Sequence, residues 1–170
     1  IVEAAGRDGF LSDGRPQILF EGHIMYKEFH KKFPDRDLAY LCKKFSTVFY
    51  PKWDKSKYFG GLGEYKRLEL AKEIDEECAL KASWGMFQIM GFNHNLCGCK
   101  DVFDFVHKMS ESHEKQLELM YYFMNNSGCL KELKEKDWAG FAKKYNGPGY
   151  AQNAYDQKLR NAYENFKNKL

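Results

Sequence analysis

The chain of 170 residues carries 27 basic and 24 acidic side chains, which gives a net charge of only +3, and 44% of its residues are hydrophobic. Charges of both signs are interspersed, which argues against the concentrated basic face of a nucleic-acid-binding protein. No apolar run is long enough to cross a bilayer, so insertion into a membrane is not expected. A chain of this length is expected to form one domain, over residues 1–170, and to be a monomer.

Apolar residues recur at helical spacing along most of the chain. Asp101, Ser112 and Asp137 stand where their side chains can cap the first turn of a helix, and Gly128 can end one. The predicted helices, in chain order, cover residues 17–32, 64–81, 84–90, 101–109, 112–126, 137–145 and about 151–166. We therefore expect an all-α fold with at most a small strand or hairpin.

Three details of this prediction depend on short stretches. Residues 46–50 are the only segment that resembles a strand, ahead of a proline and a glycine-rich break. Residues 84–90 are apolar all round apart from Gln88, which predicts a short buried helix. The inner face of the helix over 112–126 is expected to consist of Leu117, Met120, Tyr121 and Met124.

The chain has five cysteines, at positions 42, 78, 97, 99 and 129. An odd number at scattered spacing favours free thiols in a protein made in a reducing cytosol. His94, Cys97 and Cys99 lie close together in sequence, but no fourth ligand follows at a recognisable spacing. Neither a metal site nor a cofactor is therefore expected.

Two stretches, 83–91 and 145–150, combine glycines with aromatic and amide side chains. They read Ser-Trp-Gly-Met-Phe-Gln-Ile-Met-Gly and Tyr-Asn-Gly-Pro-Gly-Tyr. Small residues let two backbones approach closely, aromatic rings can stack on a flat ligand, and a Gly/Pro turn holds side chains at a rigid corner. Together the stretches predict two walls of a groove for something polar, flat-faced and uncharged, such as a sugar chain.

Single residues refine this groove hypothesis. Trp53, Tyr58 and Trp84 are the candidates for stacking on a sugar, with core packing as the alternative explanation for an aromatic residue. Trp138 lies in a regular helical stripe, which favours the core. Gln88 is an amide in an otherwise apolar segment, so it needs hydrogen-bond partners, and a bound sugar could supply some.

Cleavage of a glycosidic bond needs a carboxylic acid with a raised pKa, which lies in a partly apolar cleft. Glu3 ends an apolar segment just before a glycine-containing turn, and its alternative reading is a terminal residue without a role. Glu21 lies among apolar residues, so it is either functional or held in a buried ion pair or hydrogen bond, for example with His23. Asp54 and Glu64 flank the 55–63 loop. Either could position a water molecule, but ordinary surface positions are expected for both.

Ordered matches run along nearly the whole chain. They include Val2–Gly6, Gly9–Leu11, Asp13–Pro16, Ile18–His23, Tyr50–Trp53, Gly60–Gly61, Glu64–Tyr65, Arg67–Leu68, Ser83–Phe92 and Tyr145–Gln152. On these residues the chain resembles the N-acetylmuramidase catalytic domain of phage endolysins, a branch of the lysozyme-like superfamily. The resemblance implies a lysozyme-like helical fold that cuts the β-1,4 bond between N-acetylmuramic acid and N-acetylglucosamine in peptidoglycan. It also implies synthesis in a bacterial or phage-infected cytoplasm and action on the cell wall.

The resemblance assigns roles to residues of this sequence. The position of the family's catalytic glutamate falls on Glu3. The element at 85–88, with Ser83 beside it, would line the glycan subsites, and the element at 145–147 would bring its tyrosine to face the acid and the scissile sugar. The candidate residues are Glu3 and Glu21 for catalysis, and Ser83, Trp84, Met86, Gln88, Tyr145, Asn146 and Trp53 for glycan binding.

Three departures leave alternatives open. Ala4 stands where a serine often follows the catalytic glutamate, and Phe87 replaces a methionine. The sequence starts two residues before Glu3, so part of the first helix is expected to be lacking. An inverting hydrolase needs a second carboxylate about 6.5–9.5 Å from the acid. Without one, a lytic transglycosylase would give 1,6-anhydro products, and a domain without a working acid would only bind peptidoglycan.

Overall fold

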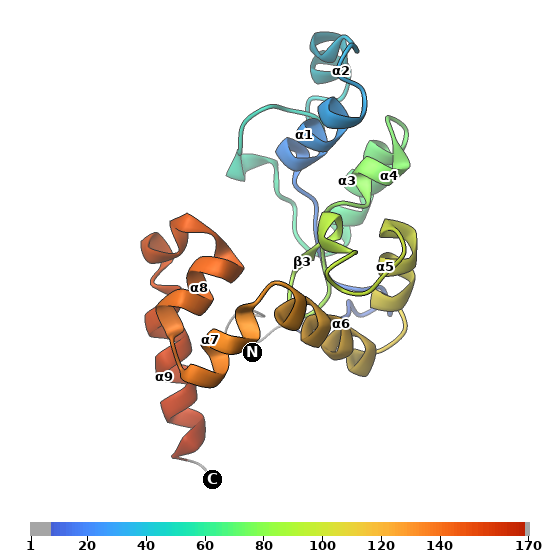
Figure 1. The fold of residues 1–170 in the computed structure, drawn as a ribbon. Helices are drawn as coiled ribbons and strands as arrows, with labels where there is room; N and C mark the ends of the chain where they lie inside the picture. Colours follow the sequence, from blue (N-terminus) through green and yellow to red (C-terminus); the bar gives the residue numbers. More distant parts are fainter. Residues whose placement is uncertain (1–7, 169–170) are drawn as a thin grey trace.

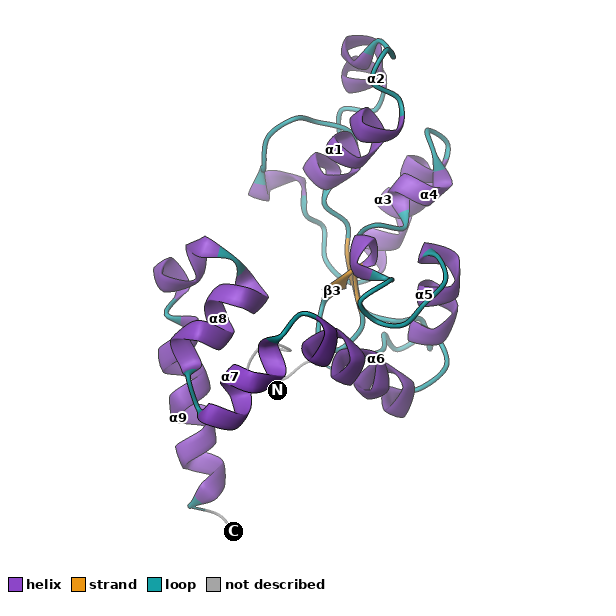
Figure 2. Cartoon of the chain, in the orientation of Figure 1, coloured by secondary structure: helices purple, strands orange, loops and turns teal. Residues whose placement is uncertain are grey.

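The computed structural model describes residues 8–168, which form helices around a small antiparallel sheet (Figures 1 and 2). Its elements in chain order are β1 (Ile18–Leu19), α1 (Gly22–Lys32), α2 (Leu38–Lys44), the 3₁₀ helix η1 (Lys55–Lys57), α3 (Leu62–Lys72), α4 (Glu76–Ala79), β2 (Ser83–Trp84), β3 (Ile89–Met90), η2 (Gly91–Asn93), α5 (Val102–Met109), α6 (His113–Asn126), α7 (Cys129–Glu135), α8 (Trp138–Asn146), η3 (Pro148–Asn153) and α9 (Tyr155–Lys167). The expected helix-dominated fold with a small strand element is confirmed.

The sheet lies at the centre of the molecule, with strand order β1-β2-β3 and both pairings antiparallel. Ile18 pairs with Trp84, which in turn pairs with Ile89. In Figure 1 helices α1 to α4 lie above the sheet, α5 lies to its right and α6 below it, and α7 to α9 form a separate group at the lower left. In that group α8 packs on both α7 and α9.

The helix predicted over residues 84–90 is wrong, because this segment is the β2–β3 hairpin. Gly85 has a φ of +72° and Gln88 a φ of +52°, and neither angle is compatible with a right-handed helix. Pairing with β1, far away in the sequence, completes the sheet.

The first predicted helix begins too early. Residues 18–19 are strand β1, and Glu21 is still extended, with φ −110° and ψ 98°, so α1 starts at Gly22. The helix predicted over 64–81 is interrupted, because α3 ends at Lys72 and α4 begins after Asp75. The extended backbone of Asp75 and its bond to the amide of Cys78 begin the new helix.

The strand predicted at 46–50 is also wrong, since these residues form turns and irregular backbone after α2. Helices α2 and α7 were not predicted.

The predicted caps are confirmed. Asp101, Ser112 and Asp137 accept hydrogen bonds from the backbone amides of Asp104, Lys115 and Gly140. Gly128 follows α6 with the left-handed φ of +76°.

The predicted inner face of α6 is displaced. Its buried residues are Gln116, Leu119, Met120 and Phe123, whereas Leu117 and Tyr121 are 58% and 52% exposed. The buried residues have the expected helical spacing, but the buried face of α6 begins one residue earlier than predicted.

The core joins the sheet to α1, α3, α5 and α6. All five cysteines are free thiols, as expected, and burial raises the pKa of Cys78 and of Cys97 to about 12. Among residues 8–168, no group of three or more His, Cys, Asp or Glu side chains could hold a metal ion. No helix in the described part of the chain has the length and apolar character needed to cross a membrane.

Candidate active site

Glu21 lies between β1 and α1, at the point where the chain leaves the sheet and the helix begins. Its backbone carbonyl accepts the amides of Ile24 and Met25 in the first turn of α1. Its side chain is 18% exposed, and its Oε1 accepts a hydrogen bond of 3.4 Å from the hydroxyl of Tyr58. The carboxyl group is therefore mostly desolvated but still open to the surface.

Burial raises the pKa of Glu21 above its ordinary value, while the hydrogen bond from Tyr58 and the charges of Lys27 and Arg67 act in the opposite direction. Burial also raises the pKa of the Tyr58 hydroxyl, so this group remains a proton donor at neutral pH. A carboxyl group with a raised pKa in a half-buried position is typical of glycosidase sites.

His23 does not form an ion pair with Glu21. Its Nε2 is 4.0 Å from Glu21 Oε1, and burial, together with the charge of Lys27, lowers the pKa of the imidazole. His23 is therefore neutral near pH 7. The ion-pair alternative for Glu21 is replaced by the hydrogen bond from Tyr58.

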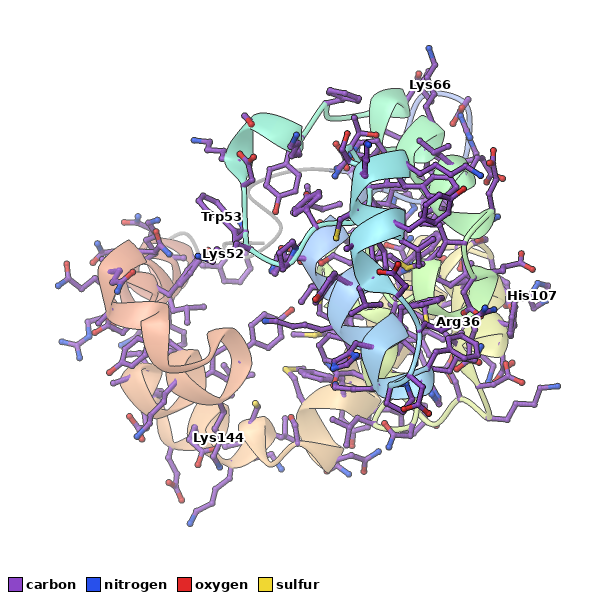
Figure 3. All side chains as sticks on the ribbon, turned by 90° about the horizontal axis from the view of Figure 1, so that it is seen from above. Arg36, Lys52, Trp53, Lys66, His107 and Lys144 are labelled. Atoms are coloured by element: carbon purple, nitrogen blue, oxygen red, sulfur yellow. The ribbon has the colours of Figure 1, made fainter. Side chains whose placement is uncertain are left out.

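Trp53 presents an aromatic surface near this carboxyl group. Its side chain is 60% exposed, and its ring centroid lies 6.5 Å from that of Tyr58, the residue that bonds Glu21. Viewed from above, Lys52 and Trp53 project from their loop on the side of the α7–α9 helices (Figure 3). A pocket of 360 Å³ lined by Tyr50, Lys52 and Trp53, among others, lies at the same loop, and neither Glu21 nor Tyr58 is among its lining residues. An exposed indole of this kind can stack on a sugar ring.

The turn of the β2–β3 hairpin contains the candidate residues Met86 and Gln88. The amide of Met86 donates to Oε1 of the fully buried Gln116 at 2.7 Å. Gln88 Nε2 donates to the carbonyl of Gly85 at 2.9 Å, so this amide has a partner within the turn. A non-glycine residue with φ near +52°, as at Gln88, is uncommon and is held by its surroundings.

Tyr145 joins helix α8 to this turn. Its hydroxyl donates to the carbonyl of Phe87 at 2.6 Å, and its ring stacks on Phe141 and meets Phe123 edge-on. The two stretches expected to form opposite walls of a groove are thus in direct contact at this point. The side chain of Asn146 and all of Glu3 lie outside the described part of the structure.

Ser83 and Trp84 are core residues, with 5% and 2% of their surfaces exposed. The Ser83 hydroxyl donates to the sulfur of Met90, and the Trp84 indole N–H donates to the carbonyl of Leu80. Stacking of Trp84 on a sugar is incompatible with this burial. Strand β2 is instead part of the core, and it leads into the turn that carries Met86 and Gln88.

The burial of one candidate residue differs from the prediction, and one buried polar residue was not predicted at all. Glu64 is completely buried, which contradicts the surface position expected for it, while Asp54 caps η1 by accepting the amide and hydroxyl of Ser56. Gln116 was missed, although a glutamine in register with the apolar Leu119 and Met120 on one helix face is a detectable signal.

A helical fold around a small antiparallel sheet is typical of the lysozyme-like class of protein, and a mostly desolvated carboxyl group is of the kind that a glycoside hydrolase needs. Comparison with protein families matches residues 1–167 to the N-acetylmuramidase family. Among solved structures, the endolysin of Burkholderia AP3 phage is 41% identical with a TM-score of 0.84. The match covers 98% of this chain and 62% of that one, so the chain spans less than two thirds of the endolysin's length. A comparison with curated proteins gave no match.

The chain therefore belongs to the N-acetylmuramidase family, and its fold and enzyme class are those of a muramidase domain. Peptidoglycan of the bacterial cell wall is the substrate class of this family.

Proposed function

We propose that this domain hydrolyses the β-1,4 bond between N-acetylmuramic acid and N-acetylglucosamine and so lyses the bacterial cell wall. The observation that carries the proposal is the half-buried carboxyl group of Glu21, whose raised pKa and Tyr58 bond suit proton transfer. The family assignment and the similarity to a phage endolysin support the substrate. Synthesis in a bacterial or phage-infected cytoplasm and action as a monomer are parts of the same proposal.

In the proposed mechanism Glu3 is the general acid that protonates the glycosidic oxygen as positive charge develops on the muramic acid. This role rests on the resemblance of its sequence context to the family's catalytic glutamate. Glu21 is the second carboxyl group, which orients and deprotonates the attacking water. The Tyr58 hydroxyl and the charges of Lys27 and Arg67 favour the ionised form of Glu21, which a general base needs. Burial raises the pKa of Glu21 and so increases its affinity for the proton of the attacking water.

The glycan is proposed to bind between the Trp53 loop and the contact of α8 with the hairpin turn. Trp53 supplies an exposed ring for stacking, and Met86 and Gln88 supply a turn whose geometry is fixed by Gln116. Tyr145 and Asn146 of α8, together with this turn, form the wall opposite Trp53. Ser83 and Trp84 contribute only through the support that β2 gives to the turn.

The test is lysis of purified peptidoglycan, followed as the loss of turbidity, with the wild type and the variants Glu3→Gln and Glu21→Gln. Each variant is expected to lower kcat by about 10²–10⁴-fold, because general acid–base catalysis contributes about that much. Circular dichroism checks that the variants are folded. Full activity of Glu21→Gln would overturn its assignment, and full activity of Glu3→Gln would overturn that of the acid.

A further inference from the structure

A buried ion pair is bonded to the backbone of Phe20, the residue before Glu21. Glu64 and Arg67, three residues apart on α3, have side chains that are 0% and 2% exposed, and Arg67 Nη1 lies 2.7 Å from Glu64 Oε2. Neither side chain reaches the surface where a glycan would bind. Their remaining hydrogen bonds go to segments that carry the candidate active-site residues.

Glu64 joins the two segments whose side chains meet in the Glu21–Tyr58 hydrogen bond. Its Oε2 accepts the backbone amide of Phe20, the residue before Glu21, at 3.0 Å. Its Oε1 accepts the amides of Phe59 and Gly60, the residues after Tyr58, at 2.6 and 2.9 Å. One carboxylate thereby fixes the distance between the two backbones.

Arg67 completes the arrangement from the other side. Its Nη1 donates to the carbonyl of Phe20 at 2.7 Å, so both polar backbone groups of that residue are held by the ion pair. Its Nη2 donates to the carbonyl of Thr47 and the hydroxyl of Tyr50, both at 3.1 Å, near the start of the loop that carries Trp53. The Tyr50 ring in turn packs so closely on Gly22 that a Cβ there would overlap it.

We propose that Glu64 and Arg67 are positioning residues for the reaction: they set the geometry of the Glu21–Tyr58 pair without touching the substrate. This inference rests on the proposed catalytic function of Glu21. Burying an ion pair carries a large desolvation penalty, and an apolar pair of similar volume often fills the same space at least as favourably. What an apolar pair could not do is bind the backbone on both sides of the site.

The first experiment measures kcat and KM for peptidoglycan with Glu64→Gln and Arg67→Lys, at a temperature where circular dichroism reports each variant as folded. A glutamine keeps the shape of Glu64 but directs an amide nitrogen at backbone N–H groups, and a lysine keeps the charge of Arg67 but has fewer donors. The expected result is a fall in kcat of about 10–100-fold with KM changed less than about twofold, because a small displacement of a catalytic group has an effect of that size.

The matched control is Glu28→Gln. Glu28 is also a buried carboxylate and is bonded to Lys31 and Lys81, but these contacts lie away from Glu21 along α1. Its substitution is expected to change thermal stability and leave kcat per folded molecule unaltered. If Glu64→Gln behaves in the same way, the positioning role is contradicted. If Glu64→Gln does not fold, Arg67→Lys alone decides by the same criterion.

A double-mutant cycle with Tyr58→Phe separates positioning from general support. If Glu64 acts through the Glu21–Tyr58 pair, Tyr58→Phe lowers kcat in the wild-type background. In the Glu64→Gln background, the fold reduction in kcat caused by Tyr58→Phe is less than half as large. Equal effects in both backgrounds overturn the proposal.

Glu21→Gln, assayed in parallel, distinguishes the catalytic role of Glu21 from the positioning role of Glu64 and Arg67. Full activity of that variant refutes the catalytic role of Glu21 itself. An inactive Glu21→Gln together with unchanged kcat in Glu64→Gln and Arg67→Lys refutes only the positioning role.

Discussion

Gln116 is the residue on which the hairpin turn of the site depends most directly, and its replacement by methionine removes every polar contact while keeping a side chain of similar length. Gln116 is fully buried. Its Oε1 accepts the amide of Met86 at 2.7 Å, and its Nε2 donates to the carbonyls of Met109 at 2.9 Å and Gly9 at 3.2 Å.

The magnitude follows from these three bonds. The amide of Met86 loses its acceptor, at a cost of about 1–3 kcal/mol for an unsatisfied group. The bonds to Met109 and Gly9 are each worth about 1 kcal/mol, and the carbonyl of Gly9 keeps the amide of Gln17 as a donor. Gln116→Met is therefore expected to lower the free energy of unfolding by about 3–5 kcal/mol. For a domain of this size that corresponds to a fall in Tm of about 6–20 °C.

Thermal unfolding followed by circular dichroism measures this effect. The matched control is Gln157→Met, because Gln157 is exposed on α9 and its substitution is expected to change stability by less than about 0.5 kcal/mol. The loosened turn is also expected to raise KM for peptidoglycan. A fall in Tm of less than about 2 °C in Gln116→Met would refute the reasoning.

Three further predictions concern the site and its support. Burial raises the pKa of Glu21 in the folded state above its ordinary value of 4.5, so ionisation of this group destabilises the fold as the pH rises through the folded-state pKa. Glu21→Gln is therefore expected to be inactive yet more resistant to guanidinium than the wild type at pH 7. This difference in resistance is expected to vanish below pH 4.5, and a lower resistance of the variant at pH 7 would contradict the prediction. Gly85→Ala is expected to destabilise the domain by more than Gly98→Ala in the same denaturation assay. Both glycines have φ +72°, but a Cβ at Gly85 would lie 2.8 Å from Gln116 Oε1 whereas one at Gly98 meets nothing within 4 Å, so equal effects would exclude the steric explanation. Trp53→Ala is expected to raise KM for soluble glycan fragments about 3–10-fold with kcat and Tm nearly unchanged, since a stacking contact contributes about 0.5–1.5 kcal/mol; an unaltered KM would remove Trp53 from the binding surface.

The features that the sequence predicts well are local. The caps at Asp101, Ser112 and Asp137 depend only on the next three residues, so their helices begin where expected. The partial burial of Glu21 was also foreseeable, because a carboxyl group among apolar residues is a local signal, whereas its catalytic role stays a prediction.

The features that were mispredicted depend on contacts between distant segments. Residues 84–90 are apolar enough for a buried helix. They form part of a hairpin because β2 pairs with β1 and because Gln88 has a positive φ. Glu64 lies in a highly charged stretch, where nothing in the sequence distinguishes it from its exposed neighbours. Its burial arises from the backbone amides of Phe20, Phe59 and Gly60, which gather around it only in the folded chain. Gln116 differs, because its position on the apolar face of α6 was detectable.

The most direct test of the muramidase account is mass spectrometry of the unreduced fragments released from purified peptidoglycan. The account predicts that every new reducing end is a hydrated N-acetylmuramic acid, and that Glu3→Gln and Glu21→Gln release these ends about 10²–10⁴-fold more slowly than the wild type. Ends lighter by one water would identify a lytic transglycosylase, and the absence of soluble fragments a binding domain. Reducing N-acetylglucosamine ends would contradict the muramidase assignment itself.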